Sequence, residues 1–211
     1  ILIMEIFLAS GNRHKQKELQ EILSEHKILI PSDVGIEFSP VENGKTFFEN
    51  SFIKAKALWD LIKKPVIADD SGICVEALNF APGIYTSRYA GPNYMQGLPD
   101  GQKISQEEQN SLLIKQLNDT HSPNRRAFYV CAMVLLLSPF QFYSVQETFE
   151  GIIIDDISKQ AGTGGFGYDP IFYLPEYEKT AAELTAEEKN SISHRGKAAR
   201  GIAKMLQSRQ G

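Results

Sequence analysis

Two adjacent aspartates, Asp69 and Asp70, stand between the apolar run Val66-Ile67-Ala68 and the dipeptide Ser71-Gly72. Side chains alternate across a strand, so neighbouring aspartates at a strand end point to opposite faces and only one enters a given site. A carboxylate at a strand's carboxyl edge is suited to Mg2+, which takes oxygen ligands and keeps several waters. The same residue types are typical of a solvated turn, and taken alone the tetrapeptide favours that interpretation.

A second candidate is the segment Ser10 to Lys15, which follows an apolar run and opens a helical pattern. Free backbone N–H groups and the positive end of a helix dipole favour an anion there. Gly11 lets the backbone approach the anion closely, and Lys15 adds a full charge one turn into the helix. The alternative is a turn with a helix cap and no ligand.

Two later stretches carry aromatic and charged groups. Thr163 to Pro170 combines glycines with Phe166 and Tyr168, either of which can stack on a base, although plain turns share this composition. From Glu187 to Lys197 the chain is charged, and its Lys189 and Arg195 can contact phosphate or a carbonyl oxygen, while His194 can bind a base edge. The alternative for the second stretch is a solvated helix start capped by Ser193.

The elements that must position these groups follow from hydrophobic periodicity. We predict a first strand over Ile1 to Ala9 rather than a signal peptide, then a helix carrying Leu19, Ile22 and Leu23. A helix over Thr46 to Lys63 is predicted to pack through Phe48, Phe52, Ala55 and Trp59.

The second half of the chain continues this alternation. We predict a strand at 66–68, an irregular loop at 81–101, a helix at 105–117 with a Ser105 and Glu108 capping box, and a final helix at 193–208. The β-prone runs 127–137 and 142–154 favour an antiparallel hairpin. The expected fold is therefore α/β, a mixed sheet flanked by helices, in a single domain over residues 1–211.

Composition narrows the function classes. With 22 Lys and Arg against 26 Asp and Glu, the net charge of -4 argues against a nucleic acid polymer as partner. Cys74 and Cys131 show no metal-type spacing and suggest reduced thiols in a cytoplasmic protein. No apolar run approaches the roughly 20 residues that span a bilayer.

In this order, the motifs closely resemble the inosine triphosphate pyrophosphatase family, its bacterial branch especially. The matching stretches are SGNRHKQKEL, GKTFFENSFIKAKA, IADDSGICVEAL, APGIYTSRYAG, GTGGFGYDPIF and KTAAELTAEEKNSISHRGKA. The resemblance implies a long mixed sheet in two lobes with a cleft between them, and a homodimer. It also implies Mg2+-dependent hydrolysis of ITP, dITP and XTP to monophosphate and pyrophosphate.

The resemblance also implies roles for individual residues. Asp70 would be the catalytic acid-base residue and a Mg2+ ligand, although the sequence leaves open whether Asp69 or Asp70 takes the proton. The residues implied to bind substrate are Ser10, Gly11, Asn12, Arg13, His14, Lys15, Ser71, Phe166, Gly167, Tyr168, Asp169, Lys189, His194 and Arg195.

One position departs from the family pattern. Relatives are expected to carry an acidic metal-associated residue where this chain has Val41, which has no group to coordinate a metal. The adjacent Glu42 is the candidate replacement ligand. Two rival functions remain at this point: a Maf-type pyrophosphatase acting on pyrimidine or modified nucleotides, and a nucleotide sensor without turnover.

Overall fold

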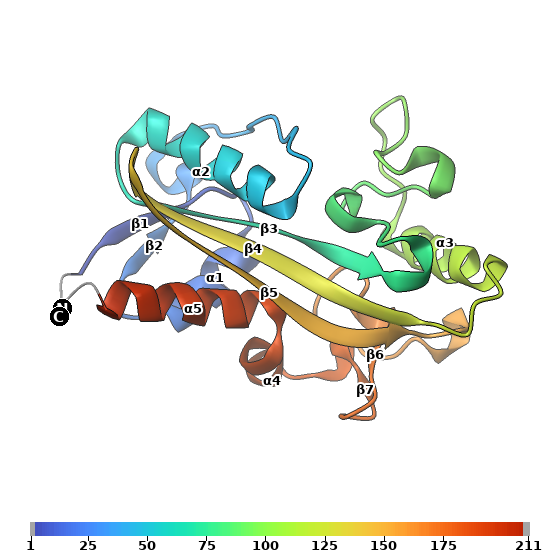
Figure 1. The fold of residues 1–211 in the computed structure, drawn as a ribbon. Helices are drawn as coiled ribbons and strands as arrows, with labels where there is room; N and C mark the ends of the chain where they lie inside the picture. The colour runs from blue at the N-terminus through green and yellow to red at the C-terminus, as the bar shows by residue number, and fades with distance from the viewer. Residues whose placement is uncertain (1–2, 209–211) are drawn as a thin grey trace. The chain divides into compact units, whose positions relative to one another are not determined.

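The computed structural model of the 211-residue chain describes residues 3–208 and shows a mixed α/β fold (Figure 1). Its seven-stranded sheet has the order β2-β1-β3-β4-β5-β6-β7. The strands are β1 (Glu5–Leu8), β2 (Lys27–Leu29), β3 (Val66–Val75), β4 (Arg126–Ser138), β5 (Gln141–Ile153), β6 (Phe172–Leu174) and β7 (Lys179–Thr180). The α-helices are α1 (Arg13–Ile22), α2 (Phe47–Ile62), α3 (Gln106–Asp119), α4 (Ala186–Ile192) and α5 (His194–Ser208).

Strand pairing confirms the predicted mixed sheet. β1 pairs in parallel with both β2 and β3, whereas β5 with β6 and β6 with β7 are antiparallel. β4 and β5 are neighbours joined by Pro139 and Phe140 alone, a connection that permits only the antiparallel hairpin that the sequence predicted. No helix within residues 3–208 is long and apolar enough to cross a membrane.

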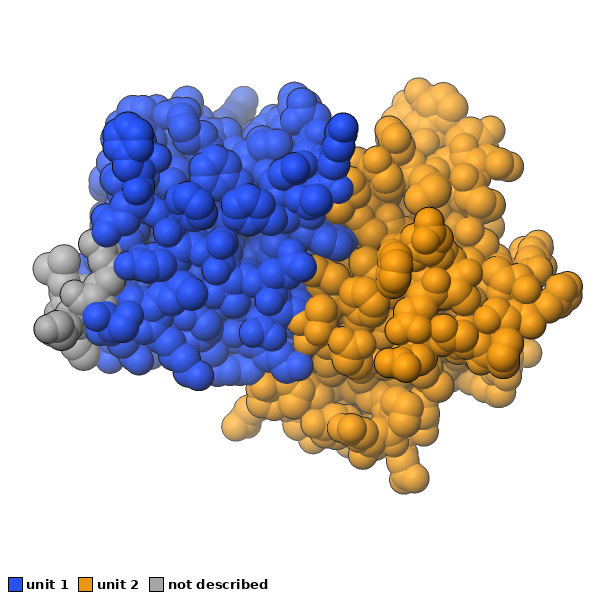
Figure 2. All heavy atoms as spheres, in the orientation of Figure 1, with its two compact units in different colours: residues 1–71, 131–147, 193–211 blue, residues 72–130, 148–192 orange. Residues whose placement is uncertain are grey.

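The chain divides into two compact units, coloured separately in Figure 2. The first unit comprises residues 1–71, 131–147 and 193–211, and the second comprises 72–130 and 148–192. Strands β3, β4 and β5 each contribute residues to both units. A single domain over 1–211 stays a prediction.

In the first unit α2 covers one face of the sheet and α1 with α5 covers the other (Figure 1), and strand side chains alternate between these two layers. One layer packs against α1 and α5, and its strand residues are Ile6, Leu8, Ile28, Ile67, Cys131, Met133 and Leu135. The other packs against α2; its strand residues are Phe7, Val66, Ala68, Val134 and Leu136, and Ala9 follows β1 into the same layer. This period of two places any strand residue in the α1/α5 layer or in the α2 layer by its position alone.

The second unit has its own core. Leu113 and Leu117 of α3 pack with Ile73 and Val75 of β3 and with Phe172 of β6. The predicted capping box of α3 is confirmed, because the Ser105 hydroxyl accepts from the backbone N–H of Glu108 while the Glu108 carboxylate accepts from that of Ser105. Residues 81–101 form the predicted irregular loop, with short 3-10 turns at Gly83–Tyr85 and Pro92–Tyr94.

Three sequence predictions need correction. Asp69 to Gly72 is not a turn, because β3 runs unbroken from Val66 to Val75 and buried pairing overrides turn composition. On α2 only Phe48 departs from the prediction, being 39% exposed; Ala55 is buried together with Leu58, and Phe52 and Trp59 pack partly buried against the same core. The short strands β2, β6 and β7 were not predicted. The predicted first strand begins at residues 1–2, which lie outside the described residues.

Candidate active site

The turn between β1 and α1 is built by side chains that cap the helix. Ser10 Oγ accepts from the backbone N–H of Asn12 at 3.1 Å. Asn12 is the N-cap residue of α1, and its Oδ1 accepts from the backbone N–H groups of His14 and Lys15 at 2.9 and 3.3 Å. The predicted helix cap is therefore present. An anion at this helix start has to share or replace the acceptors that Asn12 supplies.

Strand pairing fixes where this turn lies. The β1–β3 ladder pairs Leu8 with Ile67, and the backbone N–H of Ala9 donates to the Ile67 carbonyl at 2.8 Å. β1 ends at Leu8 while β3 continues, so the turn follows at the point of β3 that carries Asp69 and Asp70. The turn that is predicted to bind an anion and both aspartates therefore belong to one end of the first unit.

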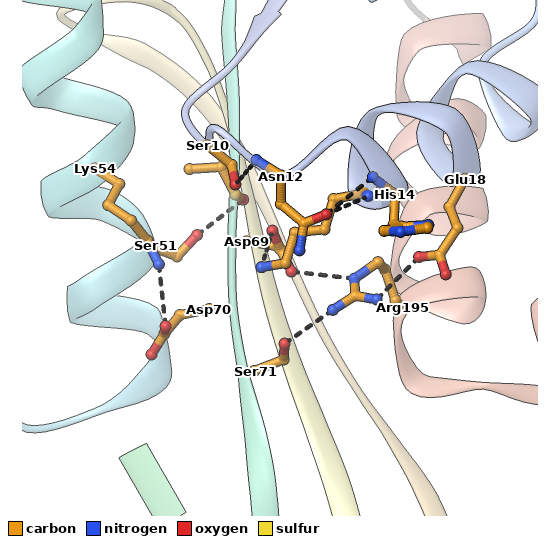
Figure 3. A network of polar contacts seen from close by, with 12 residues as sticks. Ser10, Asn12, His14, Glu18, Ser51, Lys54, Asp69, Asp70, Ser71 and Arg195 are labelled. Carbon is orange, nitrogen blue, oxygen red and sulfur yellow. Dashed lines mark hydrogen bonds and ion pairs between the residues drawn. The ribbon is translucent and has the colours of Figure 1, made fainter. Parts of the chain in front are cut away.

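Asp69 lies in the α1/α5 layer and binds two cations (Figure 3). Its Oδ1 is 2.9 Å from Lys15 Nζ, and its Oδ2 is 3.2 Å from Arg195 Nε. The Arg195 guanidinium also pairs with Glu18 at 2.9 Å and donates to Ser71 Oγ at 3.2 Å. This cluster joins α1, β3 and α5 through side chains that are largely withdrawn from solvent.

The charges in this cluster set its protonation. Burial alone would raise the pKa of Asp69, but the Lys15 ammonium and the Arg195 guanidinium outweigh it and hold that pKa well below its usual range. Burial opposes the charge of Arg195, yet Asp69 and Glu18 raise its pKa above the ordinary value. Asp69 is therefore a permanent anion at neutral pH and a weak proton acceptor.

Asp70 points into the α2 layer, as the alternation of a strand requires (Figure 3). Its Oδ1 is 3.0 Å from Lys54 Nζ, and its Oδ2 accepts from Asn50 Nδ2 at 3.3 Å. Burial raises the pKa of Asp70 above its usual value, with Lys54 opposing the rise only in part. Asp70 is therefore the better proton acceptor of the two aspartates.

The start of α2 positions these partners. Thr46 is the N-cap residue and its Oγ1 accepts from the backbone N–H of Glu49 at 3.1 Å. Asn50 Oδ1 accepts from the backbone N–H of Gly44 at 2.9 Å, which ties the preceding loop to the helix. A Cβ atom at Gly44 would lie 2.7 Å from Asn50 Oδ1, so only glycine fits there. Lys54 follows Asn50 by four residues and so lies on the same face.

The proposed metal ligands meet on this side of β3. Glu42 Oε2 lies 2.9 Å from the same Lys54 Nζ that contacts Asp70, which places the two carboxylates next to each other. Within residues 3–208 no group of three His, Cys, Asp or Glu side chains is arranged to hold a metal ion. Mg2+ is commonly held by one or two carboxylates together with substrate phosphates, so Glu42 and Asp70 fit that ion.

The predicted base-binding residues of the glycine-rich stretch lie in the second unit. The ring of Phe166 is 48% exposed, and Lys189 Nζ lies 4.7 Å from its centroid. The carboxylate of Asp169 is buried, accepts from the backbone N–H of Phe166 at 2.7 Å and pairs with Lys189. Tyr168 is buried in the core, with its hydroxyl 3.4 Å from the Thr86 carbonyl. Of the two aromatic residues in this stretch, Phe166, which precedes Gly167, is therefore the exposed one.

The remaining predicted residues have other surroundings. The Ser193 hydroxyl accepts from the backbone N–H of Gly196, which confirms the predicted cap of α5. The helix start is not solvated, however, because His194 and Arg195 are both 4% exposed. The role of Arg195 in binding substrate stays a prediction; here its guanidinium contacts Asp69, Glu18 and the Ser71 hydroxyl. Arg13 and His14 are both exposed, and the Arg13 guanidinium pairs with Asp33.

Sequence reasoning missed three residues of the first unit: Glu18, Asn50 and Lys54. Asn50 and Lys54 lie four positions apart on α2 and left a weak signal, since a polar pair at this spacing on the helix face that carries Ala55 and Leu58 requires polar partners if it is buried. Glu18 left none, since its partner Arg195 is 177 residues away in the chain.

Comparison with known proteins gives a consistent result. The model of the Ham1 family matches residues 6–205. A dITP/XTP pyrophosphatase of Treponema denticola is 50% identical over 96% of this chain and 98% of its own length, and one of Leptospira interrogans is 39% identical over 97% and 98%.

Solved structures agree with the sequence relatives. A HAM1 protein from Coxiella burnetii superposes with a TM-score of 0.85 at 36% identity, covering 98% of this chain and all of that one. The Ham1 protein of Staphylococcus aureus gives 0.83 at 36% identity, covering 97% and 99%. On both sequence and structure, this chain belongs to the Ham1 family.

Proposed function

We propose that this protein hydrolyses the non-standard purine nucleoside triphosphates ITP, dITP and XTP to the monophosphate and pyrophosphate. The observation that carries the proposal is the 50% identity, over nearly the whole of both chains, to a protein named dITP/XTP pyrophosphatase. The opposite pKa shifts of Asp69 and Asp70 support the proposed proton transfer, because Asp70 is the better proton acceptor of the two. The Maf-type alternative is not favoured, because the matching family model is that of Ham1.

In the proposed reaction the oxygen of a water molecule bonds to the α phosphorus, and the bond between that phosphorus and the oxygen bridging it to the β phosphorus breaks. Asp70 accepts the proton of that water, because its pKa is raised by burial while that of Asp69 is depressed. Pyrophosphate leaves with the bridging oxygen. Lys15 and the backbone amides at the start of α1 bind the charged phosphates.

Glu42 and Asp70 would hold Mg2+, which when bound neutralises phosphate charge and orients water. Phe166 offers an exposed ring for stacking on the base, and Lys189 beside it offers a donor for the 6-oxo group. A site built on such hydrogen bonds rejects a 6-amino base by as much as ~10^4-fold, because buried polar groups lose their partners.

The deciding experiment measures pyrophosphate release from ITP, dITP, XTP, ATP, GTP and dTTP, with Mg2+ and with EDTA. We expect rapid release from the first three with Mg2+ and little from the others. Tight dITP binding without release would indicate a sensor, and preferred pyrimidine turnover would overturn the purine assignment.

From the family resemblance we also propose a homodimer and a cytoplasmic location. Light scattering would measure the oligomeric state.

A further inference from the structure

The ammonium of Lys54 lies between the two carboxylates proposed to hold the metal. Its Nζ is 2.9 Å from Glu42 Oε2 and 3.0 Å from Asp70 Oδ1. The lysine side chain is only 10% exposed, and Figure 3 shows it reaching from α2 toward Asp70. A buried cation therefore already neutralises the oxygens that a divalent cation would need.

Contacts that do not involve Lys54 hold Asp70 and the loop that carries Glu42. Asn50 donates to the other oxygen of Asp70, and it also accepts from the backbone N–H of Gly44, two residues after Glu42. The N-cap contact of Thr46 fixes the same loop to α2. Removing the ammonium would therefore leave Asp70 and the loop of Glu42 held in place, with no cation between the two carboxylates.

A metal ion and the ammonium compete for Glu42 Oε2 and Asp70 Oδ1. Mg2+ binds carboxylate oxygens at about 2.0 to 2.1 Å and requires near-octahedral surroundings, which an ammonium at hydrogen-bond distance obstructs. Two like-signed cations at such short range also repel each other strongly in a partly buried site.

We infer that Lys54 is the resident counter-ion of the metal site in the nucleotide-free protein, and that a divalent cation enters by displacing its ammonium. This inference rests on the magnesium site of the proposed function. It assigns Lys54 a positioning role: the lysine keeps affinity for free metal low until the phosphates of a substrate provide the displaced ammonium with another anion.

The test measures Mn2+ binding to nucleotide-free protein at pH 8, by electron paramagnetic resonance of the free ion. In Lys54→Met the competing charge is gone, and we expect Mn2+ to bind at least ~10-fold more tightly than to the unchanged protein. Lys54→Arg keeps the charge and should bind Mn2+ as weakly as the unchanged protein does. Asp70→Asn in the Lys54→Met background should abolish the gain.

Lys56→Met is the matched control, because Lys56 lies on the same helix but pairs with Asp60 at the surface. Its Mn2+ affinity should not change. Equal or weaker Mn2+ binding by Lys54→Met than by the unchanged protein would overturn the inference, as would an equal gain in Lys56→Met.

A second measurement needs no variant and covers the case in which Lys54→Met fails to fold. The side-chain 15N signals of lysine in the unchanged protein should include one ammonium, Lys54, that shifts on saturation with Mg2+. A Lys54 signal that Mg2+ leaves in place contradicts displacement.

Pyrophosphate release from dITP is assayed separately. If release proceeds but the Mn2+ and 15N measurements contradict displacement, the inference alone is lost. If release is absent, the proposed function is lost.

Discussion

Asp69 and Asp70 are neighbours in the chain, yet their surroundings give them opposite properties. Asp69 binds Lys15 and Arg195, while Asp70 has Lys54 and an amide as partners. Two cations hold the pKa of the first low, and burial raises the pKa of the second. One carboxylate is therefore structural and the other is suited to proton transfer.

For Asp70→Asn we expect pyrophosphate release from dITP to fall at least ~100-fold, because the general base is lost. The melting temperature should stay the same or rise, since burial disfavours the carboxylate of Asp70 and a neutral amide avoids that cost. Steady-state kinetics and thermal denaturation measure the two effects. A variant that melts several degrees lower yet keeps its turnover would contradict both assignments.

Phe166→Ala should raise the KM for dITP by ~5-fold to ~100-fold, as loss of base stacking is worth roughly 1–3 kcal/mol. Stability should change little, because the ring is half exposed. The comparison is Tyr168→Ala, whose buried ring makes unfolding the expected result. Unchanged dITP kinetics in Phe166→Ala would exclude that ring from the base site.

At the scale of elements, the start of α2 and the start of α1 both use a glycine, for different reasons. A Cβ at Gly44 would lie 2.7 Å from Asn50 Oδ1 and 2.9 Å from Asn50 N. A Cβ at Gly11 meets no atom within 4 Å among the described residues. The first glycine serves the packing of the protein, and the second leaves room beside the helix start.

Gly44→Ala should therefore lower the free energy of unfolding by about 1–3 kcal/mol, the usual cost of overpacking, and also slow turnover by moving Glu42. Gly11→Ala should leave stability within about 0.5 kcal/mol while raising the KM for dITP. Urea unfolding and kinetics on both variants separate these effects. Equal stability losses in the two variants would refute the distinction.

Particular elements show what the sequence can predict. Helix starts at Asn12, Thr46 and Ser105 are encoded by local caps, and strand alternation alone places Asp69 and Asp70 on opposite faces. The pairing of Asp69 with Arg195 spans 126 residues, and no local pattern encodes it. The continuation of β3 through Asp-Asp-Ser-Gly was missed because pairing and burial decided it, against local turn composition.

For the whole molecule, the buried charges of the first unit predict how stability depends on pH. The folded pKa of Asp69 is depressed, so its stabilisation is present above the unfolded value of about 3.9 and is lost as pH falls toward the folded value. Asp69→Asn should cost about 3 kcal/mol at pH 7, because it removes one partner of a buried ion pair.

The difference in unfolding free energy between Asp69→Asn and the unchanged protein should shrink progressively below about pH 3.9 as Asp69 itself becomes protonated. Urea unfolding at pH 7 and at decreasing acidic pH measures this. Comparing the two proteins at each pH cancels the titration of the surface carboxylates. A difference that is constant down to the lowest pH at which both proteins fold would show that Asp69 is not stabilised as its ion pairs imply.

Because β3 is unbroken, the number of residues before Asp69 and Asp70 decides which layer each aspartate side chain enters. Removing Ala68 would bring the first aspartate into its place in the α2 layer and turn the second toward Lys15 and Arg195. The ladder between β1 and β3 at Phe7 and Leu8 would survive such a deletion. Deleting one residue here would thus exchange the aspartate that pairs with Lys15 and Arg195 for the one proposed to accept the proton, although the composition has barely changed. We therefore expect this stretch of β3 to tolerate no change in length.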